Sequence, residues 1–151
     1  MKLIFIILVI IVICVLGMHI YFRRQPKHIA HINFADLKSP SSPNYCLVYG
    51  NTNNKRLRAA PSYPISQATL IDKWQKIADA DKSLRLVRQS GEQYIYVTHS
   101  KLFAFPDVVI VEIKSLGEKQ SKLWIYSYAV YGHSDFGVNC KRVDGFLQVL
   151  H

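Results

Sequence analysis

A run of apolar residues opens the chain and limits how it can fold. Residues 3–22 contain no Asp, Glu, Lys or Arg, and the run ends at Arg23 and Arg24. About 20 residues of helix rise roughly 30 Å, the thickness of a bilayer's hydrocarbon core. We therefore expect residues 1–22 to form a transmembrane anchor or uncleaved signal anchor. The alternative is a cleaved signal peptide that ends at Val15-Leu16-Gly17.

Two features bear on the side of the membrane on which the rest of the chain lies. Basic residues follow the anchor at Arg23 and Arg24, and the positive-inside rule then favours a cytoplasmic domain. Against this, Cys46 and Cys140 lie beyond the anchor, and such a pair could form a disulfide in an oxidising compartment. We expect a single-pass membrane protein of the envelope with its domain on the extracytoplasmic side.

The chain is basic, with a formal net charge of +9 at pH 7. Only Lys2 among the charged residues precedes Arg23, so the domain and its linker carry nearly all of this charge. A basic balance favours anionic partners, and a membrane-anchored domain is a poor candidate for nucleic acid. We expect the membrane to be contacted by residues 3–22, with anionic lipid or a protein as a further partner. Lys55, Arg56 and Arg58 are the candidate lipid-docking residues.

The composition divides the rest of the chain into two parts. Residues 23–43 are polar and rich in Pro and Ser, which predicts a tether outside the core. Residues 44–151 have the usual size of one domain and are expected to fold as a single α+β unit. Within that unit, residues 45–49 read as a short strand and residues 50–58 as an exposed basic loop.

Hydrophobic periodicity predicts two helices in the domain. The first covers residues 69–80, where Thr69 and Asp72 have the spacing of a capping box and apolar residues recur every three or four positions. The second covers residues 136–150. Its predicted apolar stripe consists of Phe136, Cys140, Val143, Leu147 and Leu150.

Four segments rich in β-branched and aromatic residues lie between these helices. They are residues 84–89, 94–99, 107–114 and 123–130. Short connections join them in order, which favours an antiparallel meander. The expected fold is therefore an antiparallel β-meander of about four strands with two helices packed on one face.

Aromatic side chains recur on single faces of two of these strands. Tyr94 and Tyr96 share one face of their strand, and Trp124, Tyr126 and Tyr128 share one face of theirs. Such faces could stack bases or accept an extended partner. The alternative is cross-strand aromatic pairing or cover by the helices.

The densest group of polar and glycine residues lies between the last predicted strand and the last helix. Gly permits tight bends there, and Ser or Asp can cap the helix. The candidate contact residues are Gly132, Ser134, Asp135, Gly137, Asn139 and Arg142. A helix N-terminus could also hold an anion, although the Asp135 carboxylate competes for the same donors. His133, Asp135 and Cys140 fit no recognised metal spacing, so we expect no metal or cofactor.

Catalysis by a cysteine is the main enzymatic alternative. Cys46 or Cys140 could pair with His99 or His133 as nucleophile and base, which would make a thiol-dependent or other hydrolase. However, Cys140 lies on the predicted apolar stripe, where a thiol behaves as a small hydrophobic group. The chain has no GxSxG, HExxH or CxxC motif. The sequence therefore favours a non-enzymatic binding or accessory domain, with the hydrolase and a lipid-docking domain as alternatives.

Three stretches together resemble a known family. Residues 127–143 read Ser-Tyr-Ala-Val-Tyr-Gly-His-Ser-Asp-Phe-Gly-Val-Asn-Cys-Lys-Arg-Val. They resemble the C-terminal signature Ser-Ala-Ser-Arg-x-Gly-x-Ser-Asp-x-Gly-x-Asn-Arg-x-Arg-Val of the uncharacterised family catalogued as domain of unknown function 1499. Ser42-Pro43-Asn44 resembles the family's opening Ser-Pro-Asn-Cys, and residues 103–107 resemble its Phe-x-Phe-Val-Asp-Asp. The resemblance covers about residues 42–150 and implies no established activity.

The chain also departs from that pattern. Val130 and Cys140 stand where the family usually has Arg, and Val108 stands where it has a second Asp. The cysteine of the opening motif is displaced, with Tyr45 in its place and Cys46 one position later. The resemblance implies that a ligand site built on those two Arg and one Asp is lost in this chain.

Overall fold

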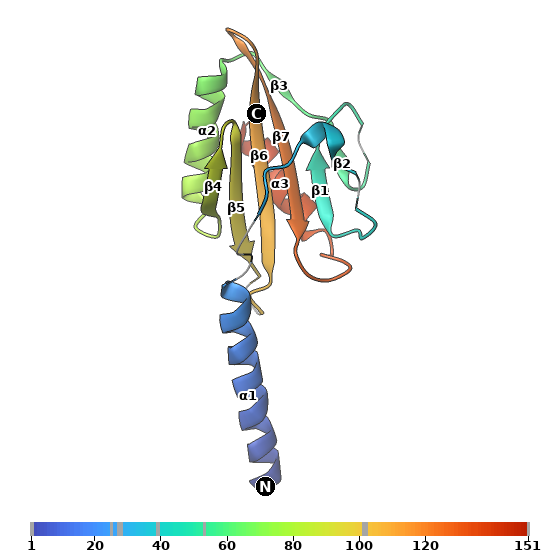
Figure 1. Cartoon of the computed structure of the whole chain (residues 1–151), viewed down its shortest axis with the longest axis vertical. Coiled ribbons are helices and arrows are strands. Elements are labelled where there is room, and N and C mark those ends of the chain that lie inside the picture. The colour runs from blue at the N-terminus through green and yellow to red at the C-terminus, as the bar shows by residue number, and fades with distance from the viewer. Residues whose placement is uncertain are drawn as a thin grey trace.

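A long N-terminal helix extends from one end of a sheet-containing domain (Figure 1). The computed structural model describes residues 2–24, 26, 29–38, 40–52, 54–100 and 103–150. Helix α1, Lys2–Arg23, is exposed along its length and is long and apolar enough to cross a membrane. A signal sequence near the N-terminus would meet the same criteria of length and composition. The prediction of one apolar N-terminal helix is confirmed.

The domain is built on one seven-stranded sheet with the order β2-β1-β7-β6-β5-β4, and β3 pairs with β7. The strands are β1 (Tyr45–Val48), β2 (Leu57–Arg58), β3 (Ser62–Tyr63), β4 (Arg85–Ser90), β5 (Gln93–His99), β6 (Pro106–Gly117) and β7 (Gln120–Ala129). Neighbours from β4 to β7 pair antiparallel. The mixed class of helices and strands is confirmed, and the expected meander forms one part of a larger sheet.

The prediction of about four strands is wrong, because three short strands extend the sheet. β1 matches the short strand predicted at residues 45–49, whereas β2 and β3 were not predicted. β1 pairs antiparallel with β7, and β2 then pairs parallel with β1. β2 lies inside the predicted basic loop of residues 50–58. β2 and β3 have two residues each, which is too short for a period of two to appear in the sequence.

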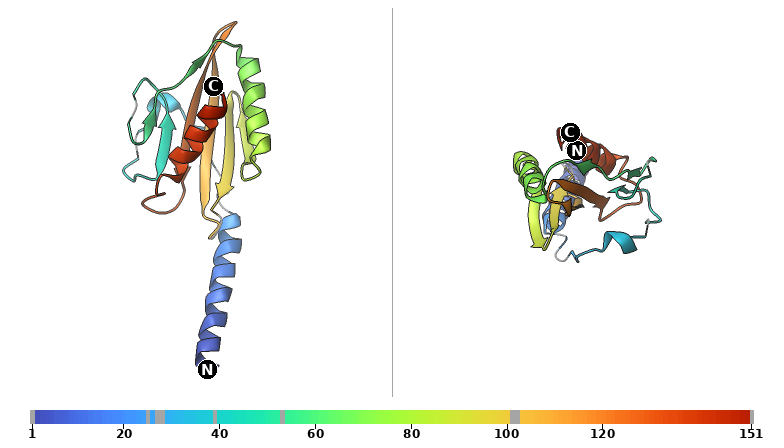
Figure 2. Two further views of the ribbon diagram at one scale, coloured as in Figure 1. Left: turned by 180° about the vertical axis from the view of Figure 1, so that it is seen from behind. Right: turned by 90° about the horizontal axis from the view of Figure 1, so that it is seen from above.

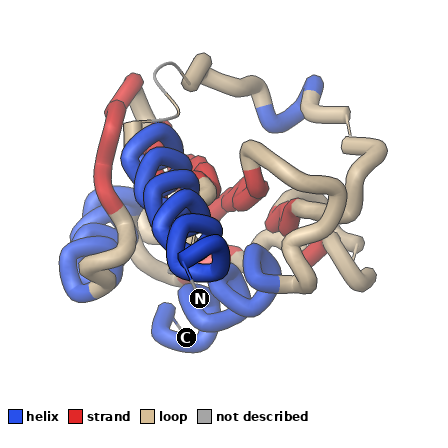
Figure 3. The backbone as a smooth tube through the Cα atoms, turned by 90° about the horizontal axis from the view of Figure 1, so that it is seen from below, coloured by secondary structure: helices blue, strands red, loops and turns tan. Residues whose placement is uncertain are grey.

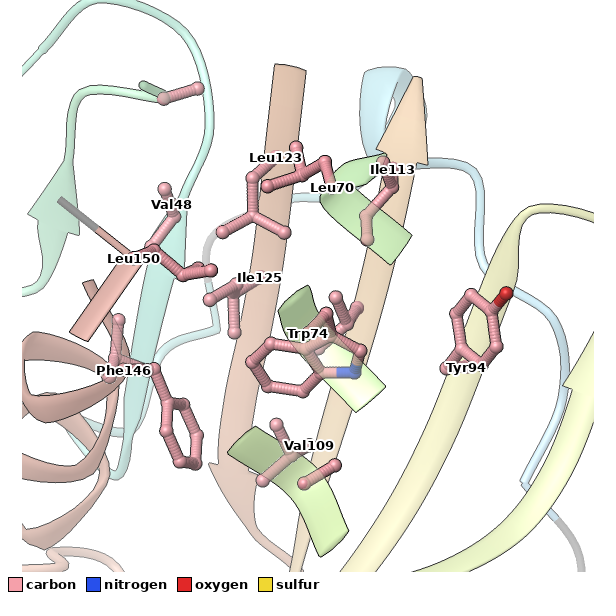
Figure 4. Packing of buried hydrophobic residues seen from close by; sticks show 14 of the residues in the cluster. Val48, Leu70, Trp74, Tyr94, Val109, Ile113, Leu123, Ile125, Phe146 and Leu150 are labelled. Carbon is pink, nitrogen blue, oxygen red and sulfur yellow. The ribbon is translucent and has the colours of Figure 1, made fainter. Parts of the chain in front are cut away.

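Two helices cover one face of the sheet, as Figure 2 shows from behind. They are α2 (Gln67–Ala80) and α3 (Val138–Leu150). Trp74 of α2 is fully buried between the sheet and Phe146 of α3 (Figure 4). Its indole N–H donates to the Tyr96 hydroxyl at 3.0 Å. The face that carries Tyr94 and Tyr96 is therefore core beneath the helices and is not an open platform.

Both helices begin at positions other than the predicted ones. Ser66, not Thr69, caps α2, because its hydroxyl accepts from the Thr69 backbone N–H at 3.2 Å. In α3 the first helical residue is Val138, and Phe136 lies before it with φ 53° and 94% of its surface exposed. Phe136 is therefore not part of the apolar stripe, which includes the buried Phe146 instead.

The opposite face of the sheet is covered by part of the predicted tether. We call residues 29–37 the strap. The strap contains a short 3₁₀ helix, η1 (Phe34–Asp36), and it crosses in front of the sheet in Figure 1. Phe34 is 2% exposed and packs with Tyr49 and Trp124, while Ile29, Ile32 and Leu37 pack around the same cluster. The prediction that this segment lies outside the core is wrong, because the second sheet face is apolar and needs cover.

One buried amide attaches the strap to the sheet. The Gln93 side chain accepts from the Ile32 backbone N–H at 3.1 Å and donates to the Ile32 carbonyl at 3.0 Å. The same side chain donates to Glu112 at 2.7 Å, and Lys114 pairs with Glu112 at 2.8 Å. Gln93 is 1% exposed, and it supplies partners to both backbone groups of Ile32 and to one carboxylate oxygen of Glu112.

We expect Gln93→Met to loosen the strap. Met has a similar length but offers neither donor nor acceptor of comparable strength, so the Ile32 backbone and Glu112 lose partners at a cost of about 1–3 kcal/mol. Amide hydrogen exchange should become faster across residues 29–37. The exposed Gln89 supplies the control Gln89→Met, which should leave this exchange unchanged. Equal exchange in both variants would contradict the role of Gln93.

Candidate functional site

The three family-like stretches meet at one end of the sheet. β6 begins there and β7 ends there (Figure 1), and α1 extends from the same end, toward the viewer in Figure 3. We call this end of the domain the anchor end. Ser42 to Asn44 lead into β1, Asp107 stands at the start of β6, and the signature connects β7 to α3. Residues separated by up to about a hundred positions therefore form one cluster.

Asp135 organises the turn that precedes α3. One carboxylate oxygen accepts from the Asn139 N–H at 2.9 Å, and the other accepts from the Gly137 N–H at 3.1 Å and pairs with Arg56 at 3.2 Å. Burial alone would raise the pKa of Asp135, but the hydrogen bonds from the two backbone N–H groups and from Arg56 hold it below its ordinary value. Asp135 therefore remains ionised and occupies the donors of the helix N-terminus.

Arg142 joins β6, β7 and α3. Its guanidinium donates to Asp107 at 2.9 Å, to the Asn139 side-chain oxygen at 2.7 Å and to the Ser127 hydroxyl at 3.3 Å. Ser127 in turn donates to Asn139, and both of these residues are fully buried. Burial raises the pKa of Asp107, and the Arg142 charge offsets part of this shift. We call Asp107, Ser127, Asn139 and Arg142 the arginine cluster.

Asn44 ties the start of the domain to the signature. Its side-chain N–H groups donate to the Gly132 carbonyl at 2.7 Å and to the Ala129 carbonyl at 3.2 Å. Its own carbonyl accepts from the Ala129 N–H at 2.9 Å and from the Asn139 side chain at 3.4 Å. The Ser42 hydroxyl donates to the Asn44 side-chain oxygen at 2.9 Å. The family-like stretch at residues 42–44 therefore stabilises the turn that follows β7.

A disulfide links Cys46 of β1 to Cys140 of α3, across a separation of 94 residues. These are the positions of the displaced family cysteine and of one missing family arginine. The two departures from the family pattern therefore occur together and produce one covalent connection. While the disulfide is intact, neither sulfur is available as a nucleophile. The other missing family groups are replaced by Val108, which is fully buried, and Val130, which is partly buried.

Aromatic rings connect α1 to the anchor end. The Phe22 ring lies 4.7 Å from that of Phe105 and 4.9 Å from that of Tyr131, both edge to face. Phe105 precedes β6 and Tyr131 follows β7, so the last turn of α1 contacts both chain segments that flank the arginine cluster. Rings at the end of an apolar helix are typical of a membrane interface.

Two hollows flank the cluster. The first has a volume of about 420 Å³ and lies between Ile29 of the strap and the end of β7. We call it the tyrosine hollow. Its lining includes Ile29, Asn44, Tyr126, Tyr128 and Val130. The second, of about 360 Å³, is lined by Lys55, Arg56, Ser134, Phe136, Gly137 and Cys140. Each hollow touches the signature without exposing the arginine cluster itself.

Two of the three predicted lipid-docking residues form ion pairs within the domain. Arg56 pairs with Asp135, and Arg58 donates to both carboxylate oxygens of Asp144 at 2.7 and 2.9 Å. The Asp144 contact raises the pKa of Arg58. Lys55 alone among the three is exposed and without an ion pair in the described part of the chain. The ion pairs of Arg56 and Arg58 connect the region of β2 to the region of α3.

The remaining predicted site residues are not brought together. Ser134 is exposed and accepts from the Phe136 N–H at 3.2 Å, and His133 is exposed on the same turn. Among the described residues, no group of three His, Cys, Asp or Glu could hold a metal ion. Sequence reasoning missed Asn44, Asp107 and Ser127 as parts of the site. Asn44 and Asp107 were marked only by the two weaker family-like stretches, and Ser127 only as the first residue of the signature.

The fold and the cluster define a class of protein. It is an α+β domain joined to one apolar helix, with a polar cluster at the junction and a disulfide beside it. The family model described as "Protein of unknown function (DUF1499)" matches residues 36–150, so the chain belongs to this family, and the resemblance is confirmed. Comparison with curated proteins and with solved structures finds no match to the chain.

The lowered pKa of Asp135 predicts how stability depends on pH. A carboxyl group whose folded pKa lies below its unfolded value of about 3.9 stabilises the fold above that value, and the contribution is lost as the pH falls toward the folded pKa. Asp135→Asn should cost about 1–2 kcal/mol at pH 7 and progressively less below about pH 4. Urea denaturation of the full chain in detergent measures this. Asp72→Asn on the exposed side of α2 is the control, and a loss independent of pH would contradict the ionic role.

Proposed function

We propose that the chain is a single-pass membrane protein of the cell envelope whose domain is a non-enzymatic binding or accessory module. The observation that carries this proposal is that the buried polar side chains of the signature are already paired with other groups of the protein. A general base or nucleophile must reach a substrate with a free lone pair. Here Asp135 is occupied by backbone N–H groups and Arg56, and Asp107 and Asn139 are occupied by Arg142. The signature therefore shapes and stabilises a surface.

The tyrosine hollow is the best candidate for the contact surface. Its volume of about 420 Å³ falls within the usual range of ligand pockets, about 300–1,000 Å³. Tyr126 and Tyr128 stack at 4.8 Å and supply an apolar wall, while Asn44 supplies a polar edge beside Gly132. Burial raises the pKa of both tyrosines, so they remain neutral hydrogen-bonding groups. This combination supports binding of a partly apolar group from a partner.

The disulfide supports a domain on the extracytoplasmic side. Disulfides persist in oxidising compartments and are rare where thiols are kept reduced. The Cys46–Cys140 pair also disfavours the thiol-dependent hydrolase, because both candidate nucleophiles are oxidised. Cys14 is a free cysteine, but it lies within the apolar α1.

Thiol labelling in right-side-out membrane vesicles tests the side and the chemistry together. We expect a membrane-impermeant maleimide to modify neither Cys46 nor Cys140 until an impermeant reductant is added, and both afterwards. Peptide mass spectrometry reads the result. Labelling without reductant would contradict the disulfide, and labelling of one cysteine alone would favour the thiol-dependent enzyme. Protection that persists with reductant but ends on lysis would place the domain in the cytoplasm.

Photo-cross-linking tests the contact surface. A benzophenone amino acid in place of Tyr128 should give a defined adduct in membranes, whereas the same residue in place of the exposed Lys73 on α2 should not. Unlabelled partner in excess should suppress the Tyr128 adduct once the adduct has been identified. Equal adducts at both positions would contradict a binding role for the tyrosine hollow.

A further inference from the structure

A third hollow at the anchor end is surrounded by basic side chains. It has a volume of about 340 Å³ and is lined by Arg23, Lys82, Ser83, Arg85 and His99. Arg23 closes α1, Lys82 and Ser83 lie in the turn after α2, and β4 begins at Arg85. Three separate elements therefore direct cations toward one space, and no carboxylate contributes to its lining.

Among the residues that the structure describes, the three cations of this hollow lack the ion pairs that four other basic residues of the domain make. Arg56, Arg58, Lys114 and Arg142 all pair with carboxylates. Within the ranges that the structure describes, Arg23, Lys82 and Arg85 make no such pair. The nearest acid in sequence, Asp81, accepts from the Ser83 N–H at 2.9 Å and from its hydroxyl at 2.7 Å, so it is occupied within its own turn. The lining of the hollow therefore carries positive side chains and, among the described residues, no carboxylate paired with them.

The position of the hollow relative to α1 indicates what kind of anion it meets. Arg23 is the first charged residue after the apolar run, so a helix that spans the bilayer places it at the level of the lipid phosphates. Phe22, one residue earlier, contacts Phe105 and Tyr131 and holds the domain close to that level. Lys82 and Arg85 belong to the domain but line the same hollow as Arg23. The hollow therefore opens where headgroups are concentrated.

We propose that this hollow binds the phosphate of an anionic membrane phospholipid. Arginine presents a planar fork that matches phosphate oxygens, and lysine adds a flexible point charge. One headgroup bridged between Arg23 of the anchor and Arg85 of the sheet would fix the tilt of the domain on the bilayer. The inference rests on the proposed membrane anchoring, and it places lipid contact away from Lys55, Arg56 and Arg58.

Lipid titration of the full chain in neutral detergent tests this inference. The probe is dioctanoyl phosphatidylglycerol, with bound lipid counted by native mass spectrometry. Lys82→Gln combined with Arg85→Gln removes two charges, and we expect binding to weaken about 30-fold, at roughly 1 kcal/mol for each charge near the membrane surface. The matched control is Lys73→Gln combined with Lys119→Gln, two exposed sites away from the hollow, which should change binding less than twofold.

The outcomes separate the competing explanations. Equal weakening in both double variants would overturn the site and leave only the general charge of the surface. Displacement of the lipid by millimolar inorganic phosphate would assign the hollow to free phosphate instead. Arg23→Gln lies outside the sheet and repeats the test without risk to folding. If alkaline carbonate extracts the chain from membranes, the proposed anchoring fails; if the chain stays embedded while neither variant weakens lipid binding, this inference alone fails.

Discussion

The pairing of Arg142 with Asp107 is the interaction on which the anchor end depends. Asp107 is partly withdrawn from water, which raises its pKa, and Arg142 supplies the compensating charge at 2.9 Å. The same guanidinium bonds Asn139 and Ser127, so the start of β6, the end of β7 and the first turns of α3 are fixed together. Breaking such a pair from one side typically costs about 3–5 kcal/mol, because it leaves a buried charge without a partner.

The disulfide lies beside this cluster and changes the meaning of the departures from the family pattern. Considered separately, Cys140 stands where the family pattern has an arginine, and Cys46 stands one position after the family's cysteine. Together they connect β1 to α3, and a loop of this length makes a disulfide worth about 2–5 kcal/mol. The chain therefore secures by a covalent bond a junction that the polar groups of the signature also hold.

Long periodic segments were predictable from the sequence, and short or tertiary features were not. The segments of β4 to β7 and α2 have the length for a period to appear, so their existence was predicted. Phe34 stands in a polar, Pro-containing segment, and its burial depends on a sheet face that local pattern does not reveal. Likewise the signature marked Asp135 and Arg142, but the register that brings Asp107 and Asn44 to them arises only from the pairing of β1, β6 and β7.

Measuring the depth of the domain relative to the bilayer tests most directly whether the anchor end lies against the membrane. Nitroxide labels are attached at His133→Cys, near the anchor end, and at Glu118→Cys, on the opposite β6–β7 turn, in a Cys14→Ala background with the disulfide intact. In reconstituted bilayers, each label reports its collisions with oxygen and with a water-soluble nickel complex. We predict restricted nickel contact at position 133, as in the headgroup region, and bulk-water contact at position 118. Equal bulk-water contact at both positions would contradict a domain held by its anchor end against the membrane.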